Sequence, residues 1–184
     1  PPTIGHEKLL DVSHMKGTGE HRIYATQTTD SNKNPLEWKT KIKYMRKVFP
    51  KHARMILMDK KVKTIFDALV IAHDDGFKNL ELVAGSDRVK EFEKLVNKYN
   101  GKKGPHGFYD FAEITVISAG ERDPDAEGAE GMSASKMRAA AKDNDLVSFT
   151  QGLPKKYKDA EGLMNAVRSG MGLSEEKSFR QDVK

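Results

Sequence analysis

Two short segments near opposite ends of the chain carry side chains that could bind phosphate. The first, Thr3-Ile4-Gly5-His6, comes directly before a helical pattern. Thr3 offers a hydroxyl, Gly5 permits close approach of a ligand to the backbone, and His6 offers an imidazole that stabilises negative charge. Because a helix N-terminus attracts anions, this segment suits a triphosphate. In most sequences, however, the same pattern is only a helix start with Thr3 as its cap and His6 on the surface.

The second segment is Met132-Ser133-Ala134-Ser135-Lys136-Met137-Arg138, where a loop again turns into a helix. Ser133 and Ser135 can bind β- and γ-phosphate oxygens through their hydroxyl and N–H groups. Arg138 can donate two hydrogen bonds to the same group, and Lys136 adds positive charge. The alternative is a helix that is capped by serine and has solvated cations.

Two further groups could complete a nucleotide site. Leu82-Val83-Ala84-Gly85-Ser86-Asp87 runs from an apolar stretch into a turn. Open α/β sheets bind ligands beyond the carboxyl ends of their strands, which is where Gly85 and Asp87 would lie. A tight turn before the next helix is the alternative. From a basic cluster, only Lys41 is predicted to reach phosphate; the other cations are predicted to form a solvated helix face: Lys33, Lys39, Lys43 and Arg46.

Between these segments, short apolar runs alternate with helical patterns. The runs predict four strands, at Arg22–Thr26, Arg54–Met58, Leu80–Ala84 and Ile114–Ser118. Helices are predicted over 35–48, 62–73 and 89–99, and two or three more between Ser133 and Gly170. Strands that alternate with helices imply βαβ units, and therefore a parallel, doubly wound, Rossmann-like α/β sheet with helices on both faces.

Together and in this order, the segments resemble the cytidylyltransferase-like nucleotidyltransferase superfamily. Its motifs run His/Thr-x-Gly-His early and Ile-Ser-Ser/Thr-x-x-Arg late, and here they read Thr3 to His6 and Met132 to Arg138. The threonine is similar to the form in phosphopantetheine adenylyltransferases. Gly85-x-Asp87 is similar to the strand-end motif of nicotinamide mononucleotide adenylyltransferases. The resemblance implies a nucleotidyltransferase-like domain over residues 1–154, followed by a C-terminal helical extension and tail over 155–184.

The resemblance also implies an activity. A nucleoside monophosphate, AMP in preference to CMP, would pass from a nucleoside triphosphate to a small phosphorylated acceptor, and pyrophosphate would be released. Mg²⁺ would be carried by the triphosphate and not by protein ligands. The catalytic residues would be His6, Thr3 and Lys41. The nucleotide contacts would come from Gly5, Gly85, Asp87, Ser133, Ser135, Lys136 and Arg138.

The sequence departs from the family pattern at its start. In this family a glycine-containing strand and loop precede the histidine motif, and that strand lies in the middle of the sheet. Here only Pro1 and Pro2 stand before the motif. Loss of a central strand would leave buried backbone groups unpaired, at about 1 to 3 kcal/mol each. We therefore expect the working protein to contain residues before Pro1, or another segment or chain to fill the gap.

The absent strand and the polar end of the chain favour an alternative function. In that alternative, the fold persists as a non-catalytic nucleotide-binding or structural module in an assembly. A homo-oligomer or an assembly partner is left open as well. The acidic, turn-rich loop 121–128 is predicted to lie near the mouth of the site, where Arg122 would pair within its own loop or belong to a lid.

Composition fits one globular domain of 184 residues, 37% of which are hydrophobic. Lys and Arg total 32 against 27 Asp and Glu, a mild excess of +5 that suits polyphosphate without requiring it. The absence of Cys excludes disulfides and thiolate chemistry, and the six His are too scattered to suggest a metal site.

The sequence also sets expectations about location and partners. It lacks an apolar run of the ~20 residues that a membrane helix needs, so we expect a cytoplasmic protein without a membrane partner. A nucleic-acid partner is not expected either, because the sequence shows neither a recognition-helix pattern nor a basic stripe interleaved with aromatic residues.

Overall fold

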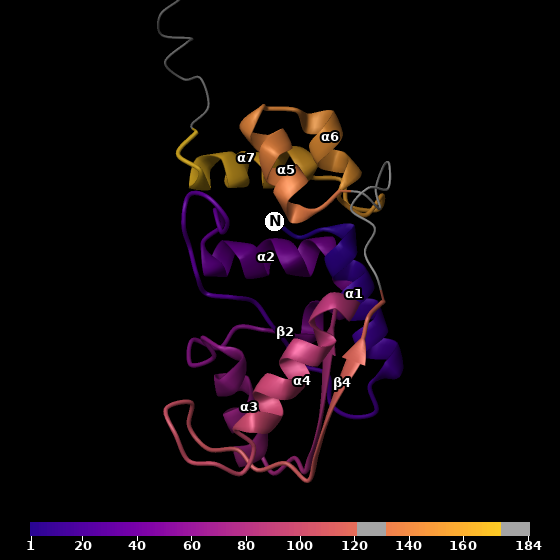
Figure 1. Cartoon of the computed structure of the whole chain (residues 1–184). Coiled ribbons are helices and arrows are strands. Elements are labelled where there is room, and N and C mark those ends of the chain that lie inside the picture. The colour runs from indigo at the N-terminus through magenta and orange to yellow at the C-terminus, as the bar shows by residue number, and fades with distance from the viewer. Residues whose placement is uncertain (121–131, 174–184) are drawn as a thin grey trace, which may run out of the picture. The chain divides into compact units, whose positions relative to one another are not determined.

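The computed structural model describes residues 1–120 and 132–173 of the chain (Figure 1). The predicted loop 121–128 with Arg122, and the tail from Ser174, lie outside the described residues. The chain divides into two compact units. The first unit comprises Pro1–Glu7, Gln27–Ile56 and Asp123–Lys184, and the second comprises Lys8–Thr26 and Leu57–Arg122. Helix α1 (Ile4–Lys16) begins in the first unit and ends in the second.

The second unit contains a parallel β-α-β arrangement. Strand β3 (Asn79–Ala84) pairs with β4 (Glu113–Ser118) in parallel, with Asn79 opposite Glu113 and Ala84 opposite Ser118. Helix α4 (Val89–Lys98) connects the two strands and packs on them (Figure 1). Parallel neighbours require such a crossover, so the predicted alternation of strand and helix is confirmed here.

The core of the second unit lies where helix α3 (Ile65–Asp74) meets α4 and the parallel pair. A capping box starts α3, because Thr64 Oγ1 accepts the N–H of Asp67 and the Asp67 carboxylate accepts the N–H of Thr64. The buried core residues are Phe66, Leu69, Ala72, Val96, Tyr109 and Phe111. Tyr109 donates its hydroxyl hydrogen bond to the carbonyl of Val96, which satisfies the one polar group that this ring brings into the core.

A second two-stranded sheet is shorter than predicted. It pairs β1 (Ile23–Tyr24) with β2 (Ile56–Leu57), whereas the sequence predicted strands over 22–26 and 54–58. The 3₁₀ helix η1 (Pro50–Met55) occupies the start of the later range. Pro50 at its first position favours a helical turn, because its fixed φ and missing N–H suit a helix start.

The fold class is therefore mixed α/β with a parallel strand pair. The wider doubly wound sheet stays a prediction. Among the described residues, none of the helices combines the length and the apolar character that crossing a lipid bilayer would require.

Helices dominate the first unit. Helix α2 (Trp38–Val48) is followed by η1, and three short helices come later in the chain: α5 (Ala134–Lys142), α6 (Leu146–Gln151) and α7 (Ala160–Gly170). These three pack against one another (Figure 1). Each begins at a polar cap whose side chain accepts a backbone N–H: Ser133, Asp145 and Asp159. The prediction of two or three short helices in this range is confirmed.

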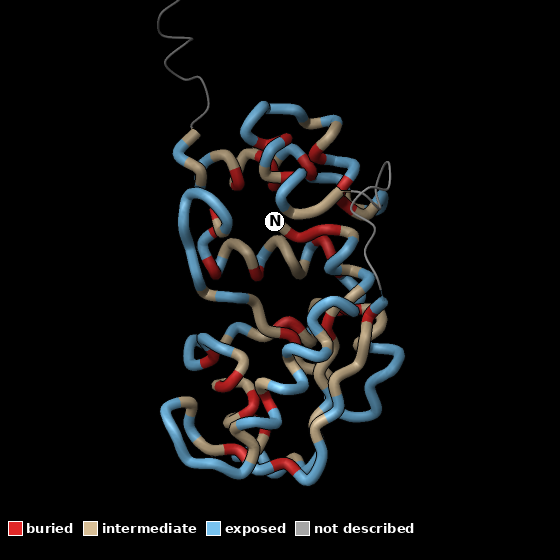
Figure 2. The backbone as a smooth tube through the Cα atoms, in the orientation of Figure 1, coloured by how far each residue is buried: buried red, intermediate tan, exposed pale blue. Residues whose placement is uncertain are grey.

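Close contacts join α7 to α2 and to the segment before α2 within the first unit. A side chain on Gly170 would overlap the carbonyl oxygen of Pro35, so only glycine permits this approach. The Tyr44 hydroxyl on α2 donates to the carbonyl of Gly162 at 3.2 Å. Arg168 on α7 donates to the carbonyl of Ala141 at 2.6 Å and so satisfies the end of α5. Figure 2 shows the buried residues along these helices.

Tyr157, in the loop before α7, carries a buried hydroxyl. Among the described residues this hydroxyl has no hydrogen-bond partner. Burial raises the pKa of Tyr157 to about 12, and the neighbouring Asp159 and Tyr44 add to the increase. The two neighbouring tyrosines therefore differ, because the hydroxyl of Tyr44 donates a hydrogen bond and that of Tyr157 has no partner among the described residues.

We predict that Tyr157→Phe leaves the free energy of unfolding unchanged or raises it by up to about 1 kcal/mol, because the change removes an unsatisfied buried hydroxyl. The matched change Tyr44→Phe should lower it by about 1 kcal/mol, because the Gly162 carbonyl loses its donor. Urea unfolding at pH 8 measures both. A lower stability of Tyr157→Phe than of Tyr44→Phe would contradict this assignment.

The same pair tests the raised pKa. Above pH 10 the unfolded chain ionises Tyr157 before the folded chain does, so the wild type loses stability between pH 10 and about 12. Tyr157→Phe should lose less stability over this range, as measured by urea unfolding at stepped pH.

Candidate functional site

The predicted Thr3–His6 segment forms the first turn of α1. Thr3 is 4% exposed, and its Oγ1 accepts the backbone N–H of His6 at 3.2 Å. In return, Nδ1 of the exposed His6 ring accepts the backbone N–H of Thr3 at 3.1 Å. This is the reciprocal arrangement of a capping box with histidine in the place of the usual glutamate. The helix-start interpretation of this segment is therefore confirmed.

The same hydrogen bonds fix the imidazole for chemistry. Since Nδ1 accepts a hydrogen bond from an N–H group, the proton of the neutral ring lies on Nε2. An Nε2–H group is a donor that can stabilise developing negative charge on a phosphate oxygen. Capping thus uses the Nδ1 edge of the ring, and a hydrogen bond to phosphate would use the Nε2 edge. Gly5 is less constrained, because a Cβ there would be only in ordinary contact with Thr3 Oγ1, at 3.4 Å.

The predicted Ser133–Arg138 segment forms the first turn of α5. Ser133 caps the helix, and its Oγ accepts the N–H of Lys136 at 3.2 Å. Ser135 and Lys136 are exposed, and Arg138 is half-buried with one guanidinium nitrogen 3.3 Å from Ser135 Oγ. The serine-cap interpretation is confirmed here too. The N-terminal N–H groups of the helix, a hydroxyl and a guanidinium therefore stand together, and these groups bind anions.

Gly152 links the starts of α1 and α5. Its carbonyl oxygen accepts the N–H of Ile4 at 2.8 Å. A Cβ on Gly152 would overlap Sδ of Met137 and lie 2.7 Å from its Cγ, and it would lie 3.3 Å from Cβ of Met132. Met137 is fully buried on α5. The end of α6 therefore contacts the first turns of both α1 and α5, the two helices that contain the predicted phosphate-binding segments.

Lys41 is a further predicted phosphate contact in the first unit. It is half-buried on α2, whereas Lys39 and Lys43 beside it are exposed. Burial lowers the pKa of Lys41, and the Asp30 carboxylate partly offsets this effect. Three backbone N–H groups, those of residues 32–34, donate to Asp30 and hold it in place.

Pro1 lies where these elements meet. The positive charges of Arg138 and Lys41 both act on the backbone nitrogen of Pro1, which is largely buried. Such an effect requires both cations to lie near Pro1. The structure thus brings together Thr3, Arg138 and Lys41 around one point of the first unit.

Gly85 and Asp87 belong to the second unit. They follow directly after β3, in the short helix η2 (Ser86–Arg88) and at its cap. The N–H of Arg88 donates to the carbonyl of Gly85 at 2.9 Å, and the N–H of Ser86 donates to Gly120, beyond the end of β4, at 3.3 Å. Both residues therefore stand at the carboxyl edge of the parallel pair. Their predicted contact with the nucleotide stays a prediction.

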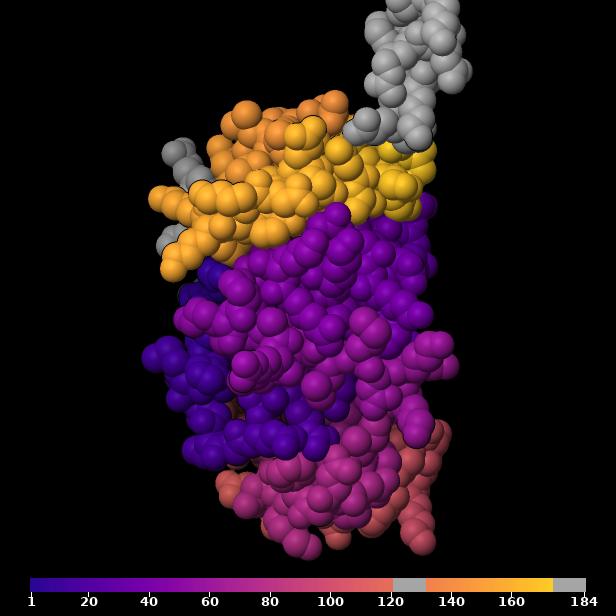
Figure 3. Space-filling view, turned by 180° about the vertical axis from the view of Figure 1, so that it is seen from behind, coloured from indigo at the N-terminus to yellow at the C-terminus, as the bar shows by residue number. Residues whose placement is uncertain are grey.

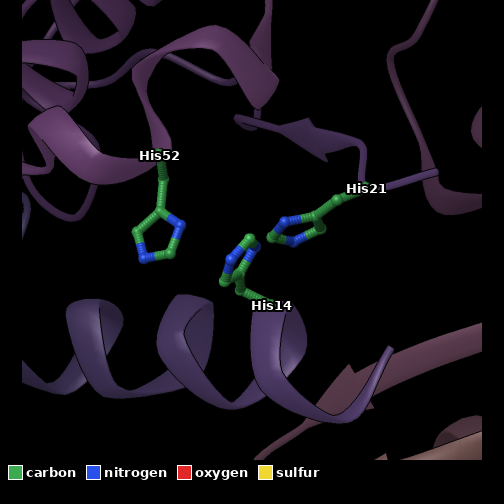
Figure 4. A group of neighbouring side chains, drawn as sticks. All are labelled: His14, His21 and His52. Atoms are coloured by element: carbon green, nitrogen blue, oxygen red, sulfur yellow. The ribbon is translucent and has the colours of Figure 1, made fainter. Parts of the chain in front are cut away.

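Histidines other than His6 lie in both units. In the second unit, His14 and His21 have ring centroids 6.0 Å apart, and Nε2 of His21 is 2.8 Å from Ser13 Oγ (Figure 4). The figure also labels His52, which belongs to η1 of the first unit and is 2% exposed. Also in the second unit, His106 stacks on Phe66 with ring centroids 4.0 Å apart.

Sequence reasoning missed Gly152 and Asp30. No periodicity or motif distinguishes Gly152, because its role depends on a methionine that lies fifteen residues earlier in the chain. Asp30 could have been suspected, since Asp-Ser-Asn is typical of a turn in which the carboxylate accepts backbone N–H groups. Its proximity to Lys41 could not have been foreseen.

Comparisons with known proteins leave the family open. No protein-family model matches the chain, and neither a curated protein nor a solved structure is significantly similar to it.

We predict that Gly152→Ala lowers the free energy of unfolding by about 1 to 3 kcal/mol, because the added methyl overlaps the fully buried side chain of Met137. Gly19→Ala is the control, since a Cβ there meets nothing within 4 Å. Thermal unfolding measures both variants. Equal stability of the two would show that Gly152 does not fix the junction.

Proposed function

We propose that the chain is a nucleotidyltransferase-like protein that binds a nucleoside triphosphate and transfers its nucleoside monophosphate, AMP in preference to CMP, to a small phosphorylated acceptor. One observation carries this proposal. The two segments that resemble the family's motifs lie far apart in the sequence, yet both form helix starts that contact the same glycine.

The chemistry of the gathered residues also supports the proposal. Thr3, His6, Lys41 and Arg138 supply hydrogen-bond donors and positive charge, as does the start of α5. Phosphate oxygens require such partners, whereas a Mg²⁺ ion held by the protein alone would require oxygen ligands such as carboxylates. This set therefore fits a triphosphate that carries its own Mg²⁺, which would neutralise charge on the phosphate oxygens when bound.

In the proposed reaction, an acceptor phosphate oxygen attacks the α-phosphorus in line. The new phosphorus–oxygen bond forms while the bond to the β-phosphate oxygen breaks, and pyrophosphate leaves with that electron pair. The Nε2–H of His6 donates to an α-phosphate oxygen as charge develops there. Arg138 and the Ser133–Ser135 turn bind the β- and γ-phosphates, and Lys41 neutralises charge beside them. An ionised acceptor needs no general base.

The family fold is part of the proposal. A Rossmann-like doubly wound sheet would extend the β3-β4 pair, and the observed β-α-β arrangement supports this extension. The family's strand-end contacts would then come from Gly85 and Asp87.

The second candidate is a nucleotide-binding or structural module without catalysis. The capping role of His6 favours it, because Thr3 and His6 would be kept for helix stability alone. Pyrophosphate release from ATP or CTP in the presence of phosphorylated acceptors separates the candidates. The transferase releases pyrophosphate, whereas the module binds the nucleotide without turnover.

We predict that His6→Ala lowers turnover at least about 100-fold, as expected for loss of a donor to developing charge, and changes nucleotide affinity less than threefold. Pyrophosphate release gives turnover, and titration calorimetry gives affinity. His14→Ala, eight residues further along α1, is the control and should keep full turnover. Unchanged turnover of His6→Ala would remove the catalytic role of this residue.

We further predict that Lys41→Gln and Arg138→Gln each weaken triphosphate binding about 10- to 100-fold, because each removes a charge-assisted hydrogen bond of about 1.5 to 3 kcal/mol. Arg138→Lys should recover only part of the loss, since lysine cannot form the two parallel bonds. Lys142→Gln, in the last turn of α5, is the control. Equal affinities of all four variants in calorimetry would contradict the site.

A further inference from the structure

The positive charge of the chain is concentrated in one unit. The described residues of the first unit contain fifteen Lys and Arg against seven Asp and Glu, a net charge of +8. Those of the second unit contain thirteen against twelve, a net charge of +1. The whole chain has a net charge of only +5, because residues 121–131 contain five Asp and Glu against one Arg. The mild overall value therefore conceals a strongly basic unit.

On α2, part of this charge forms a single row. Lys39, Lys43 and Lys47 are spaced four residues apart, and all three are exposed. Side chains at this spacing lie on one face of a helix, about 6 Å apart along its axis. The buried residues Trp38, Ile42 and Val48 mark the opposite face, which packs into the unit. None of the ion pairs described in the structure includes a lysine of this row.

A second group of lysines adjoins the row. Lys155, Lys156 and Lys158 are exposed in the loop before α7. Tyr157 in this loop lies near enough to Tyr44 on α2 for Tyr44 to raise the pKa of Tyr157, and Tyr44 is hydrogen-bonded to Gly162. The ammonium groups of Lys43 and Lys47 are 5.7 and 5.9 Å from the Tyr44 ring centroid.

The two groups of lysines thus flank one pair of neighbouring tyrosines. Figure 3 shows the purple surface of the α2 region bordering the orange surface of the later segment. We refer to these six residues as the lysine face: Lys39, Lys43, Lys47, Lys155, Lys156 and Lys158.

We propose that the lysine face binds the phosphate backbone of a nucleic acid. A row of ammonium groups against repeated phosphates gains free energy from the release of counterions and needs no apolar contact. A membrane-surface helix would expose apolar residues next to its lysines. The exposed large apolar residues of the described chain are Met15, Met58 and Val147, and none of them belongs to α2 or to the loop before α7.

The sequence predicted that nucleic acid is not a partner, and this proposal differs from that prediction. The sequence conceals the face because half of it lies more than a hundred residues after the other half. The proposal is independent of the transferase activity, since the face does not include Lys41, His6 or Arg138.

Helix α4 of the second unit offers a matched control. Lys90, Lys94 and Lys98 have the same spacing and are also exposed. Acidic residues stand among them, namely Glu91 and Glu93, and their unit is nearly neutral. If the charges around a lysine row decide whether it binds phosphate, replacing the lysines of α2 should weaken binding and replacing those of α4 should not.

The test is fluorescence anisotropy of labelled 20-nucleotide single-stranded DNA, single-stranded RNA and duplex DNA, titrated with the protein between 50 and 200 mM salt. We expect affinity for at least one probe to fall about a thousandfold across this range, as for six phosphate contacts. K39Q/K43Q/K47Q should reduce the slope of log affinity against log salt by about 2 to 3. K90Q/K94Q/K98Q should bind like the wild type.

Further variants and competing ligands complete the test. The loop variant K155Q/K156Q/K158Q should reduce the slope as the α2 variant does. It therefore tests the proposal even if circular dichroism shows that the α2 variant is misfolded. Absence of binding to every probe at 50 mM salt overturns the proposal, and so does an equal loss in the α2 and α4 variants. Binding only to phosphatidylserine vesicles would assign the face to membranes instead. Displacement of the probe by 1 mM ATP, with the α2 variant unaffected, would assign binding to the nucleotide site.

Discussion

The contact between Gly152 and the first turns of two helices is what the arrangement of the first unit depends on. Its carbonyl holds the N–H of Ile4, and its missing side chain leaves room for the buried Met137. A helix start binds anions only in the direction in which its N–H groups point, so this junction sets how α1 and α5 can act together. Because protein interiors are close-packed, a single methyl group at this position is enough to disturb the arrangement.

At the start of α1, the capping hydrogen bonds also determine the tautomer of His6. The bond from the Thr3 N–H to Nδ1 of His6 caps the helix and also leaves the proton of the neutral ring on Nε2. The structural and functional interpretations of this segment are therefore compatible. The same holds for Ser133, whose hydroxyl caps α5 while the N–H groups of that turn remain suited to phosphate.

The cations of the first unit fall into three environments that carry different roles. Arg46 and Arg168 donate to backbone carbonyls and so stabilise the fold. Lys41 is half-buried near Asp30 and close to Pro1. The lysine face is exposed to solvent. Burial decides among these roles, because a charge that is withdrawn from water must find a carbonyl, a carboxylate or a ligand, whereas an exposed charge is already solvated.

The sequence by itself determined the local structure. Apolar periodicity predicted helices α2, α3 and α4 and the strands β3 and β4, and the Thr3 and Ser133 patterns predicted helix starts, because caps and periodicity act over a few residues. Only the tertiary structure decided that Gly152 joins those starts, that Lys41 is half-buried while its neighbours are exposed, and that two groups of lysines flank one pair of tyrosines. These features depend on contacts between residues far apart in the chain, and such contacts leave no periodic signal in the sequence.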